Sequence, residues 1–272
     1  MPVPEPGAAV AATDAADLAL LTEAAEVAGA VAQRHFGSGP ESWEKADGSG
    51  PVSQADLEID ALLRQRLLAA RPGYGWLSEE TEDDPARLDC SSVFIVDPID
   101  GTRAFLEGQK GFCHAVAVAR DGQVTAAAVH LPLLGLTYAA RRDGGATLNR
   151  QPIRAGGGQG IGGARVLAGR MPMTAAHWKG GVAPPVQRHF RSSLAWRLCL
   201  VAEGRFDATL TLRPTWEWDI AAAALIAGEA GIRVTDRHGC GLAFNRPHPA
   251  AAGLIAAGPA LHAALFERLK PA

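Results

Sequence analysis

Apolar residues recur along the chain at two different spacings. The first is helical and extends over residues 14–36, with Gly37 as a helix stop; it is formed by Leu18, Leu21, Ala25, Ala28 and Ala32. A second amphipathic helix carries Leu57, Leu62, Leu63 and Leu67. Further helices are predicted over about 192–203, over about 219–230 in an Ala-rich segment, and from residue 260 onward. Helices are therefore expected in both parts of the chain.

The second spacing is that of short extended segments. Runs of apolar and β-branched residues predict strands over 74–77, 93–96, 112–119, 123–130 and 136–140, and Asp121-Gly122 predicts a hairpin turn. We expect the three segments over 112–119, 123–130 and 136–140 to form an antiparallel sheet. Later strands are predicted over 165–168, 206–212, 233–235 and 254–256. The Gly-rich residues 151–163 suggest a boundary, so we expect a mobile tail over 1–12, an amino-terminal α+β half over 13–150 and a carboxy-terminal α/β half over 151–272.

Composition narrows the class of protein. The chain has 272 residues, of which 47% are hydrophobic, which is enough for a sizeable core. Its net charge of −3 shows no basic excess, so nucleic-acid binding is not expected. No apolar run reaches the length of about 18 residues that a membrane span needs. The four scattered cysteines form no C-x-x-C pair, and the first residues lack the basic start of a secretory signal, so we expect buried thiols in a cytoplasmic protein.

The segment over residues 93–102 carries the strongest chemical signal. Four apolar residues predict a buried strand that stops at Asp97 and Asp100, and Pro98 and Gly101 favour a rigid turn that brings the two carboxylates together. Two like charges held this close repel unless a cation lies between them, and Mg²⁺ is the natural candidate. The alternative is a solvated turn, since Asp, Pro and Gly are common turn residues.

Three other acids stand at ends of predicted elements, and each has a structural explanation. Asp56 lies three residues after Ser53, which is the spacing of a helix cap. Glu79 follows a strand and is adjacent to Glu80, so it could simply be solvated. Asp219 falls in the first turn of a helix, where the helix dipole favours a carboxylate. His114 and His130 are interpreted as core or edge residues, since no second His or Cys stands at metal-ligand spacing.

Taken together, these segments resemble the inositol monophosphatase family of Mg²⁺-dependent, lithium-sensitive phosphatases. The resemblance covers about residues 13–269 and rests on four blocks in the family's order: the loop from Lys45 to Asp56, Ser78-Glu79-Glu80, the D-P-I-D-G-T segment over 97–102, and Trp218-Asp219 before an Ala-rich helix. The loop departs from the family's pattern by one extra residue, Gly50 or a neighbour. The implied fold is the α/β (α+β) layered αβαβα sandwich of the sugar phosphatases. Homodimers are common in the family.

The resemblance also implies roles for individual residues. Two or three Mg²⁺ ions would be held by Glu79, Asp97, the Ile99 carbonyl, Asp100 and Asp219. Catalysis would involve Thr102 orienting the attacking water, Asp56 accepting its hydroxyl proton, and Glu79 acting through the metal. The substrate would contact Glu79, Ile99, Asp100, Gly101, Thr102 and Asp219. A short helix over 103–109 would present the Gly101 and Thr102 amides to a phosphate group.

Within the family, the chain looks most like the CysQ-like branch, which hydrolyses 3′-phosphoadenosine 5′-phosphate to AMP. The similar features are Leu77-Ser78-Glu79-Glu80, the segment 45–52, Phe105, residues 192–204 and Pro214-Thr215. Leu212 stands where inositol phosphatases commonly carry a Glu that binds sugar hydroxyls. Two features stand against this branch. The segment Asp97-Pro98-Ile99 has the sequence typical of inositol phosphatases, and Arg213 is not preceded by the aromatic residue found in many nucleotidases. The alternatives are a phosphatase for inositol, sugar or histidinol phosphate, and, from another class, a non-catalytic regulatory binding protein on the same fold.

Overall fold

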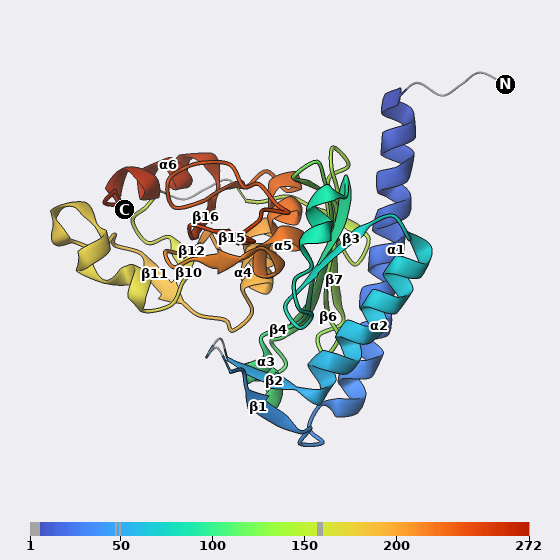
Figure 1. The fold of residues 1–272 in the computed structure, drawn as a ribbon. Coiled ribbons are helices and arrows are strands. Elements are labelled where there is room, and N and C mark those ends of the chain that lie inside the picture. The colour runs from blue at the N-terminus through green and yellow to red at the C-terminus, as the bar shows by residue number, and fades with distance from the viewer. Residues whose placement is uncertain (1–5, 47, 49, 157–159, 272) are drawn as a thin grey trace.

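The chain is arranged in five alternating layers of helices and sheets (Figure 1). The structure is a computed structural model that describes residues 6–46, 48, 50–156 and 160–271. Helices α1 (Pro6–His35) and α2 (Gln54–Ala70) cover one face of a seven-stranded sheet. Helices α4 (Leu194–Ala202) and α5 (Glu217–Glu229) lie between this sheet and a five-stranded sheet, and α6 (Pro259–Arg268) packs on the far side. The predicted αβαβα sandwich is therefore confirmed.

The first helix begins earlier than the sequence pattern predicts. It starts at Pro6, so residues 6–12 of the expected tail are helical. Proline is favoured at the first position of a helix, and the alanines that follow have high helix propensity, so a helix can begin here without a regular apolar spacing in the sequence. Residues 1–5 of the expected tail lie outside the described part of the chain.

The seven-stranded sheet has its strands in the order β3 to β9. They are β3 (Gly75–Ser78), β4 (Ser92–Asp100), β5 (Cys113–Arg120), β6 (Gln123–Leu131), β7 (Leu136–Arg141), β8 (Ala146–Leu148) and β9 (Gln151–Ile153). All neighbours are antiparallel except β3 and β4, which are parallel. The predicted hairpin between β5 and β6 is confirmed, with Asp121 and Gly122 at φ values of 50° and 76°.

The five-stranded sheet has the order β11-β10-β12-β16-β14. Its strands are β10 (Arg165–Leu167), β11 (Gln187–His189), β12 (Ala208–Thr211), β14 (Arg233–Thr235) and β16 (Leu254–Ala257). Two short antiparallel pairs complete the strands: β1 (Ser42–Glu44) with β2 (Pro51–Ser53), which are consecutive, and β13 (Thr215–Trp216) with β15 (Ala250–Ala251), which are separated by α5 and β14. The remaining helical segments are α3 (Thr102–Leu106), η1 (Pro85–Asp89), η2 (Met171–Met173), η3 (Ala175–His177) and η4 (Lys179–Gly181). The division of the chain near residue 150 stays a prediction.

Strand β4 is buried on both faces, which explains its continuous apolar run. Val93 and Ile95 belong to the core against α4 and α5, whereas Phe94 and Val96 belong to the core beneath α1 and α2. Successive side chains of a strand point to opposite faces, so a central strand covered by helices on both sides needs apolar residues at every position. This strand leads directly into the predicted acidic segment.

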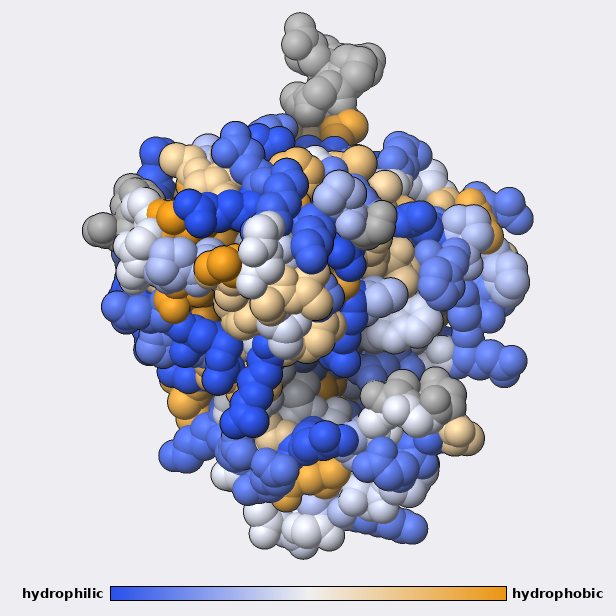
Figure 2. All heavy atoms as spheres, turned by 90° about the vertical axis from the view of Figure 1, so that its left-hand side faces the viewer, coloured by the Kyte–Doolittle hydropathy of each residue, from blue (hydrophilic) through white to orange (hydrophobic). Residues whose placement is uncertain are grey.

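The surface, the cysteines and the lengths of the helices bear on the expectations from composition. Figure 2 shows one face of the molecule, on which hydrophilic residues dominate and apolar residues form small separate patches. Cys113 and Cys199 are buried, but Cys240 is exposed and Cys90 is half-buried, so the expectation of buried thiols holds for only two of the four. Within the described ranges, no helix combines the length and the apolar character needed to cross a membrane.

Candidate active site

Parallel pairing of β3 and β4 brings two of the predicted acids together. Ser78 is opposite Val96, so Glu79 and Asp97 come next to each other where these strands lead toward the site. Asp219 approaches from the first turn of α5, which packs against β4. The structure thus gathers three carboxylates, of which Asp219 lies more than a hundred residues along the chain from the other two.

These three carboxylates form a compact group. Glu79, Asp97 and Asp219 each offer one oxygen that lies within 4.8 Å of the other two. Asp97 is 1% exposed, and its Oδ1 has no hydrogen-bond partner in the described part of the structure. Burial, followed by the charge of Glu79, raises the pKa of Asp97 well above its usual range. Burial, followed by the charge of Asp100, does the same to the pKa of Asp219. An unpaired buried oxygen among hard oxygen donors fits a divalent cation such as Mg²⁺.

Asp100 lies nearby but makes a different set of contacts. Its carboxylate accepts hydrogen bonds from the Ser193 hydroxyl at 2.7 Å and from the Ala195 and Leu194 N–H groups at 2.7 and 3.3 Å. These donors stand at the amino end of α4, where a carboxylate is favoured. Burial raises the pKa of Asp100 to about 6, against the opposing effect of these hydrogen bonds. Asp100 is therefore tied to α4, while the other three acids converge on one another.

The prediction of a turn between Asp97 and Asp100 is wrong. Strand β4 continues to Asp100, and its pairing with β5 shifts between Asp97 opposite Ala115 and Asp100 opposite Cys113. Two residues of β4 thus face one residue of β5, which is the definition of a β-bulge. A bulge keeps the segment in the sheet and still redirects its side chains, so a turn is not needed to separate the two carboxylates.

Asp56 contacts Thr102, as the resemblance implies, and it also caps α2. One carboxylate oxygen accepts hydrogen bonds from the backbone N–H and the hydroxyl of Ser53, at 2.9 and 2.5 Å. The other oxygen accepts from the Thr102 hydroxyl at 3.0 Å, and the Ile99 carbonyl is also 3.0 Å from that hydroxyl. Burial raises the pKa of Asp56 to about 6. The capping and catalytic interpretations of Asp56 are therefore compatible.

Glycine 101 sets the direction of the chain between β4 and α3. It has a φ of 104°, which a side chain rarely tolerates, and α3 begins immediately after it at Thr102. The helix predicted over 103–109 is thus shorter and one residue earlier. Thr102 is placed at its first position, facing Asp56.

Lys45 was predicted only as part of a loop, but it reaches the acidic group. Its Nζ lies 2.8 Å from Glu79 Oε1 and 2.8 Å from Glu80 Oε1. Although burial opposes protonation, the charge of Glu79 and the contact with Glu80 raise the pKa of Lys45. The loop itself is the β1–β2 hairpin, and residues 47 and 49 lie outside the described part. Glu80 and Lys45 were missed as partners because side-chain contacts between distant segments leave no local sequence signal.

Two further residues were interpreted from the sequence without a link to the site. Ser193 falls at the start of the helix predicted over about 192–203, and it caps α4, since its oxygen accepts from the Trp196 N–H at 2.9 Å. The same hydroxyl donates to Asp100. His114 is buried and its ring nitrogen Nδ1 contacts the Pro98 carbonyl oxygen, between the two aspartates. Neither His114 nor His130 belongs to the three-acid group.

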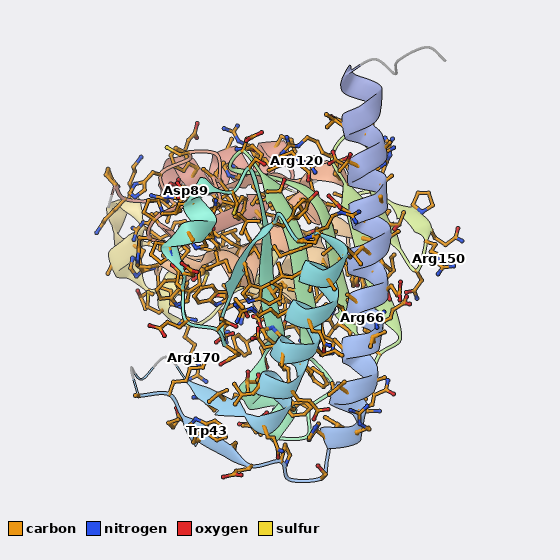
Figure 3. All side chains as sticks on the ribbon, turned by 45° about the vertical axis from the view of Figure 1, so that its right-hand side comes forward. Trp43, Arg66, Asp89, Arg120, Arg150 and Arg170 are labelled. Atoms are coloured by element: carbon orange, nitrogen blue, oxygen red, sulfur yellow. The ribbon has the colours of Figure 1, made fainter. Side chains whose placement is uncertain are left out.

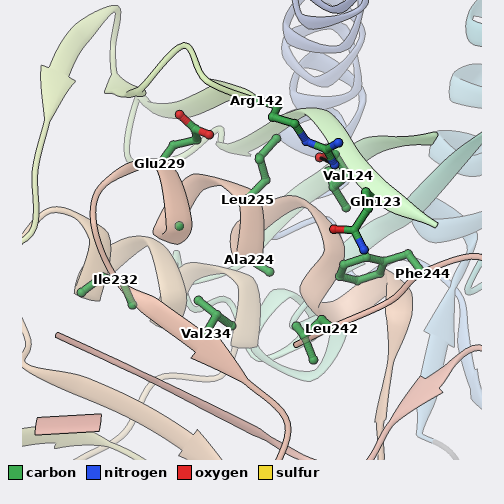
Figure 4. Close-up of a pocket in the computed structure, with 11 residues that line it drawn as sticks. Gln123, Val124, Arg142, Ala224, Leu225, Glu229, Ile232, Val234, Leu242 and Phe244 are labelled. Carbon is green, nitrogen blue, oxygen red and sulfur yellow. Dashed lines mark hydrogen bonds between the residues drawn. The ribbon is translucent and has the colours of Figure 1, made fainter. Parts of the chain in front are cut away.

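A separate pocket lies between the seven-stranded sheet, α5 and β14. Figure 4 shows Leu225, Leu242 and Phe244 around it, with Arg142 and Glu229 on one side. Glu229 accepts hydrogen bonds from the Asp143 and Gly145 N–H groups at 2.9 and 2.8 Å. None of the predicted site residues lines this pocket. It is therefore distinct from the acidic group.

Comparison with known proteins agrees with this arrangement. The inositol-1-monophosphatase of Rhizobium meliloti is 37% identical over 217 residues, covering 76% of this chain and 77% of that protein. The 3′-phosphoadenosine 5′-phosphate phosphatase of Mycobacterium bovis is 35% identical over 201 residues, covering 71% of this chain and 72% of that protein. The crystal structure of the extragenic suppressor protein suhB from Bartonella henselae has a TM-score of 0.80 and 26% identity, covering 93% of this chain and 97% of that one.

A family model extends the match to nearly the whole chain. The model that describes the inositol monophosphatase family matches residues 14–271. The matched range includes both sheets, all three acids of the compact group, and the Asp56–Thr102 pair. The chain therefore belongs to the inositol monophosphatase family and is a phosphoric monoester hydrolase.

Proposed function

We propose that this chain hydrolyses phosphate monoesters with two or three Mg²⁺ ions held by Glu79, Asp97, Asp219, Asp100 and the Ile99 carbonyl. The observation that carries the proposal is the convergence of three carboxylates, one of which, Asp97, has a buried Oδ1 without a partner among the described residues. Without a cation, this arrangement costs free energy, because buried charges of one sign repel and lack hydration. Glu79 is partly accessible, so the group has an open side toward solvent.

The residues around the acidic group supply positioning. Bound Mg²⁺ would polarise the phosphoryl group and lower the pKa of a bound water, and it would neutralise charge on the leaving oxygen. The Thr102 hydroxyl donates its proton to Asp56, which leaves lone pairs on the Thr102 oxygen to accept a hydrogen bond from the attacking water. Ser53 fixes Asp56 from the opposite side. Gly101 and Thr102 would offer backbone N–H groups to the phosphate.

For the substrate we propose a 3′(2′),5′-bisphosphate nucleotide, with 3′-phosphoadenosine 5′-phosphate converted to AMP and phosphate. Support comes from the segments 77–80 and 192–204 and from Pro214-Thr215, and from the similarity to the Mycobacterium bovis enzyme of that name. Leu212 offers no hydrogen-bonding group where a sugar-binding Glu would be expected. A second candidate is inositol 1-phosphate, which is favoured by the higher identity of 37% to the Rhizobium meliloti inositol-1-monophosphatase.

A substrate panel tests both candidates. The purified chain would be assayed with Mg²⁺ on 3′-phosphoadenosine 5′-phosphate, inositol 1-phosphate and histidinol phosphate, with Asp97→Asn as the matched inactive control. We expect kcat/KM for the nucleotide to exceed the others by at least about tenfold, which corresponds to about 1.4 kcal/mol in transition-state stabilisation. A preference for inositol 1-phosphate would replace the nucleotidase proposal. Equal, Mg²⁺-independent rates for wild type and Asp97→Asn would contradict the metal proposal.

Three further properties are expected from the family resemblance. We expect inhibition by Li⁺, a homodimer in solution and a cytoplasmic location. Light scattering measures the mass in solution, and a Li⁺ titration at fixed Mg²⁺ measures inhibition. The regulatory binding-protein alternative predicts no turnover of any substrate in the panel.

A further inference from the structure

The β-bulge in β4 removes one step of the ladder next to the acidic group. Pro98 and Ile99 lie between the paired positions Asp97 and Asp100, and only His114 lies between their partners on β5. An extra residue in a bulge disrupts the local pattern of backbone hydrogen bonds. The peptide groups of this segment therefore need other partners to keep a fixed orientation.

The His114 side chain supplies such a partner. It is fully buried, and its Nδ1 contacts the Pro98 carbonyl oxygen. A carbonyl oxygen only accepts hydrogen bonds, so Nδ1 carries the proton and donates it. Burial lowers the pKa of His114 to about 4, which leaves the ring neutral near pH 7 with its proton on Nδ1. Its Nε2 has no partner within the described residues.

The neighbours of His114 hold the ring in place. His130 on β6 is its cross-strand partner, with ring centroids 6.3 Å apart and planes at 28°, and Phe112 makes an edge contact at 6.2 Å. His130 is fixed in turn by the Thr137 hydroxyl, 2.9 Å from its Nδ1. On the other side, α1 comes so close that a Cβ on Gly29 would lie 2.7 Å from His130 Nε2. The ring of His114 therefore has little freedom to leave the Pro98 carbonyl.

We propose that His114 is a positioning residue, whose Nδ1–H donates to the Pro98 carbonyl and thereby orients the Asp97 carboxylate and the Ile99 carbonyl toward the cation site. The proposal rests on the proposed function, because it assigns His114 a part in shaping the metal site. Among the described residues, the hydrogen bond of His114 goes to Pro98, not to the three-acid group or the Asp56–Thr102 pair. Its effect is expected on cation binding, in the way that residues behind metal ligands usually act, by about 10- to 100-fold.

Two substitutions separate the hydrogen bond from simple packing. In His114→Asn the amide nitrogen can occupy the place of Nδ1, and in His114→Gln it can occupy only the place of Nε2. Both are neutral and polar, so they serve as a matched pair. His114→Leu removes the donor and keeps an apolar side chain in the core.

The first measurement is Mg²⁺ binding by calorimetry on the full chain, together with the Mg²⁺ dependence of turnover. We expect His114→Leu and His114→Gln to weaken Mg²⁺ binding about 10- to 100-fold and to keep kcat at saturating Mg²⁺ within a few-fold. His114→Asn should stay within about threefold of wild type. The proposal is overturned if Asn and Gln are indistinguishable, or if Leu binds Mg²⁺ as wild type does.

The second measurement does not depend on the metal. Nitrogen NMR of histidine-labelled wild-type protein at pH 7 should show a protonated Nδ1 and an unprotonated Nε2 for His114, with the signal assigned by its loss in His114→Asn. A proton on Nε2 would overturn the proposal even if Mg²⁺ binds. If wild type does not bind Mg²⁺ but Nδ1 is protonated, the proposed metal function fails while the hydrogen bond stands, so the two failures are distinguished.

Discussion

Two groups of acids, one buried and one partly buried, have opposite surroundings in this molecule. In the first, Asp14 and Asp17 of α1 face arginines: Arg120 pairs with both, and Arg71 lies 2.9 Å from Asp17. Tyr74 adds a hydrogen bond to Asp17 at 3.0 Å, and Figure 3 shows Arg120 close to α1. In the second, Glu79, Asp97 and Asp219 face one another, and Lys45 contacts Glu79 and its neighbour Glu80.

The difference separates a structural cluster from a binding site. A buried charge is tolerated when the protein supplies a countercharge and hydrogen bonds, as at Asp17. Asp97 keeps a buried oxygen without a partner in the described structure, and the proposed cation would supply the countercharge that the described residues do not. Removing an acid should therefore have opposite consequences at the two places.

The largest expected effect is on turnover at the second group. Asp97→Asn removes a proposed ligand and should lower kcat/KM about 10⁴-fold, which corresponds to about 5 kcal/mol. Because the substitution also removes a buried charge, the melting temperature in EDTA should stay the same or rise. Steady-state kinetics and calorimetry measure the two quantities. A variant that keeps its activity would contradict the assignment of this group.

The matched change at the first group should affect stability instead. Asp17→Asn leaves Arg71 without its carboxylate partner and Arg120 with Asp14 alone, and it should lower the free energy of unfolding by about 3 kcal/mol. Urea denaturation measures this loss. The folded fraction should keep its kcat/KM, since no contact joins Asp17 to the site. A large loss of specific activity without loss of stability would contradict the structural role of Asp17.

The pH dependence of stability should report on Asp56 and Asp100, the two buried acids beside the second group. Asp56 and Asp100 have pKa values raised to about 6 in the folded protein, against about 3.9 when unfolded, so the folded state binds more protons between about pH 4 and 6. In EDTA, the free energy of unfolding should therefore fall as the pH rises through this range, by about 2 kcal/mol for each of the two carboxyl groups and about 4 kcal/mol for both.

Melting temperatures in EDTA at pH 4.5 and pH 7 measure this effect. Saturating Mg²⁺ should stabilise the protein at pH 7, where the acids are ionised, more than at pH 4.5. Asp56→Asn is the control and should reduce the pH dependence. Stability that rises with pH in EDTA over this range would contradict the raised pKa values.

The smallest expected effect concerns Lys45. Lys45→Met removes the one cation that contacts Glu79 among the described residues, so Mg²⁺ should bind a few-fold more tightly, an effect of less than about 1 kcal/mol. Lys45→Arg keeps the charge and should bind Mg²⁺ as wild type does. Calorimetry measures both constants. Weaker Mg²⁺ binding by Lys45→Met would show that Lys45 supports the cation site rather than competing with it.

Local patterns predicted most helices and strands because each element carries its own period. The alternation in β5 and β6, the Asp121-Gly122 turn and the helical spacing in α1 and α2 are all contained within short segments. The start of α1 was misplaced because its first turns have high helix propensity but no apolar spacing. Periodicity reports burial, so it does not detect a helix end that is stabilised by propensity alone.

The site could be predicted only as far as the family resemblance supplied the residues. The convergence of Glu79 and Asp97 depends on the parallel pairing of β3 and β4, which no local pattern indicates. The hydrogen bonds from α4 to Asp100 join residues 93 positions apart or more. The bulge in β4 depends on the register with β5. Contacts of this kind are set by tertiary packing.

The Thr102 hydroxyl has a single proton and two acceptors within 3.0 Å, Asp56 and the Ile99 carbonyl. It can satisfy only one of them fully at any moment. A cation bound to the Ile99 carbonyl oxygen would compete with the Thr102 hydroxyl for that oxygen. The Thr102 proton would then point to Asp56, and the lone pairs of the Thr102 oxygen would have a fixed orientation. In this way, filling the cation site would also select the hydroxyl rotamer that receives the water.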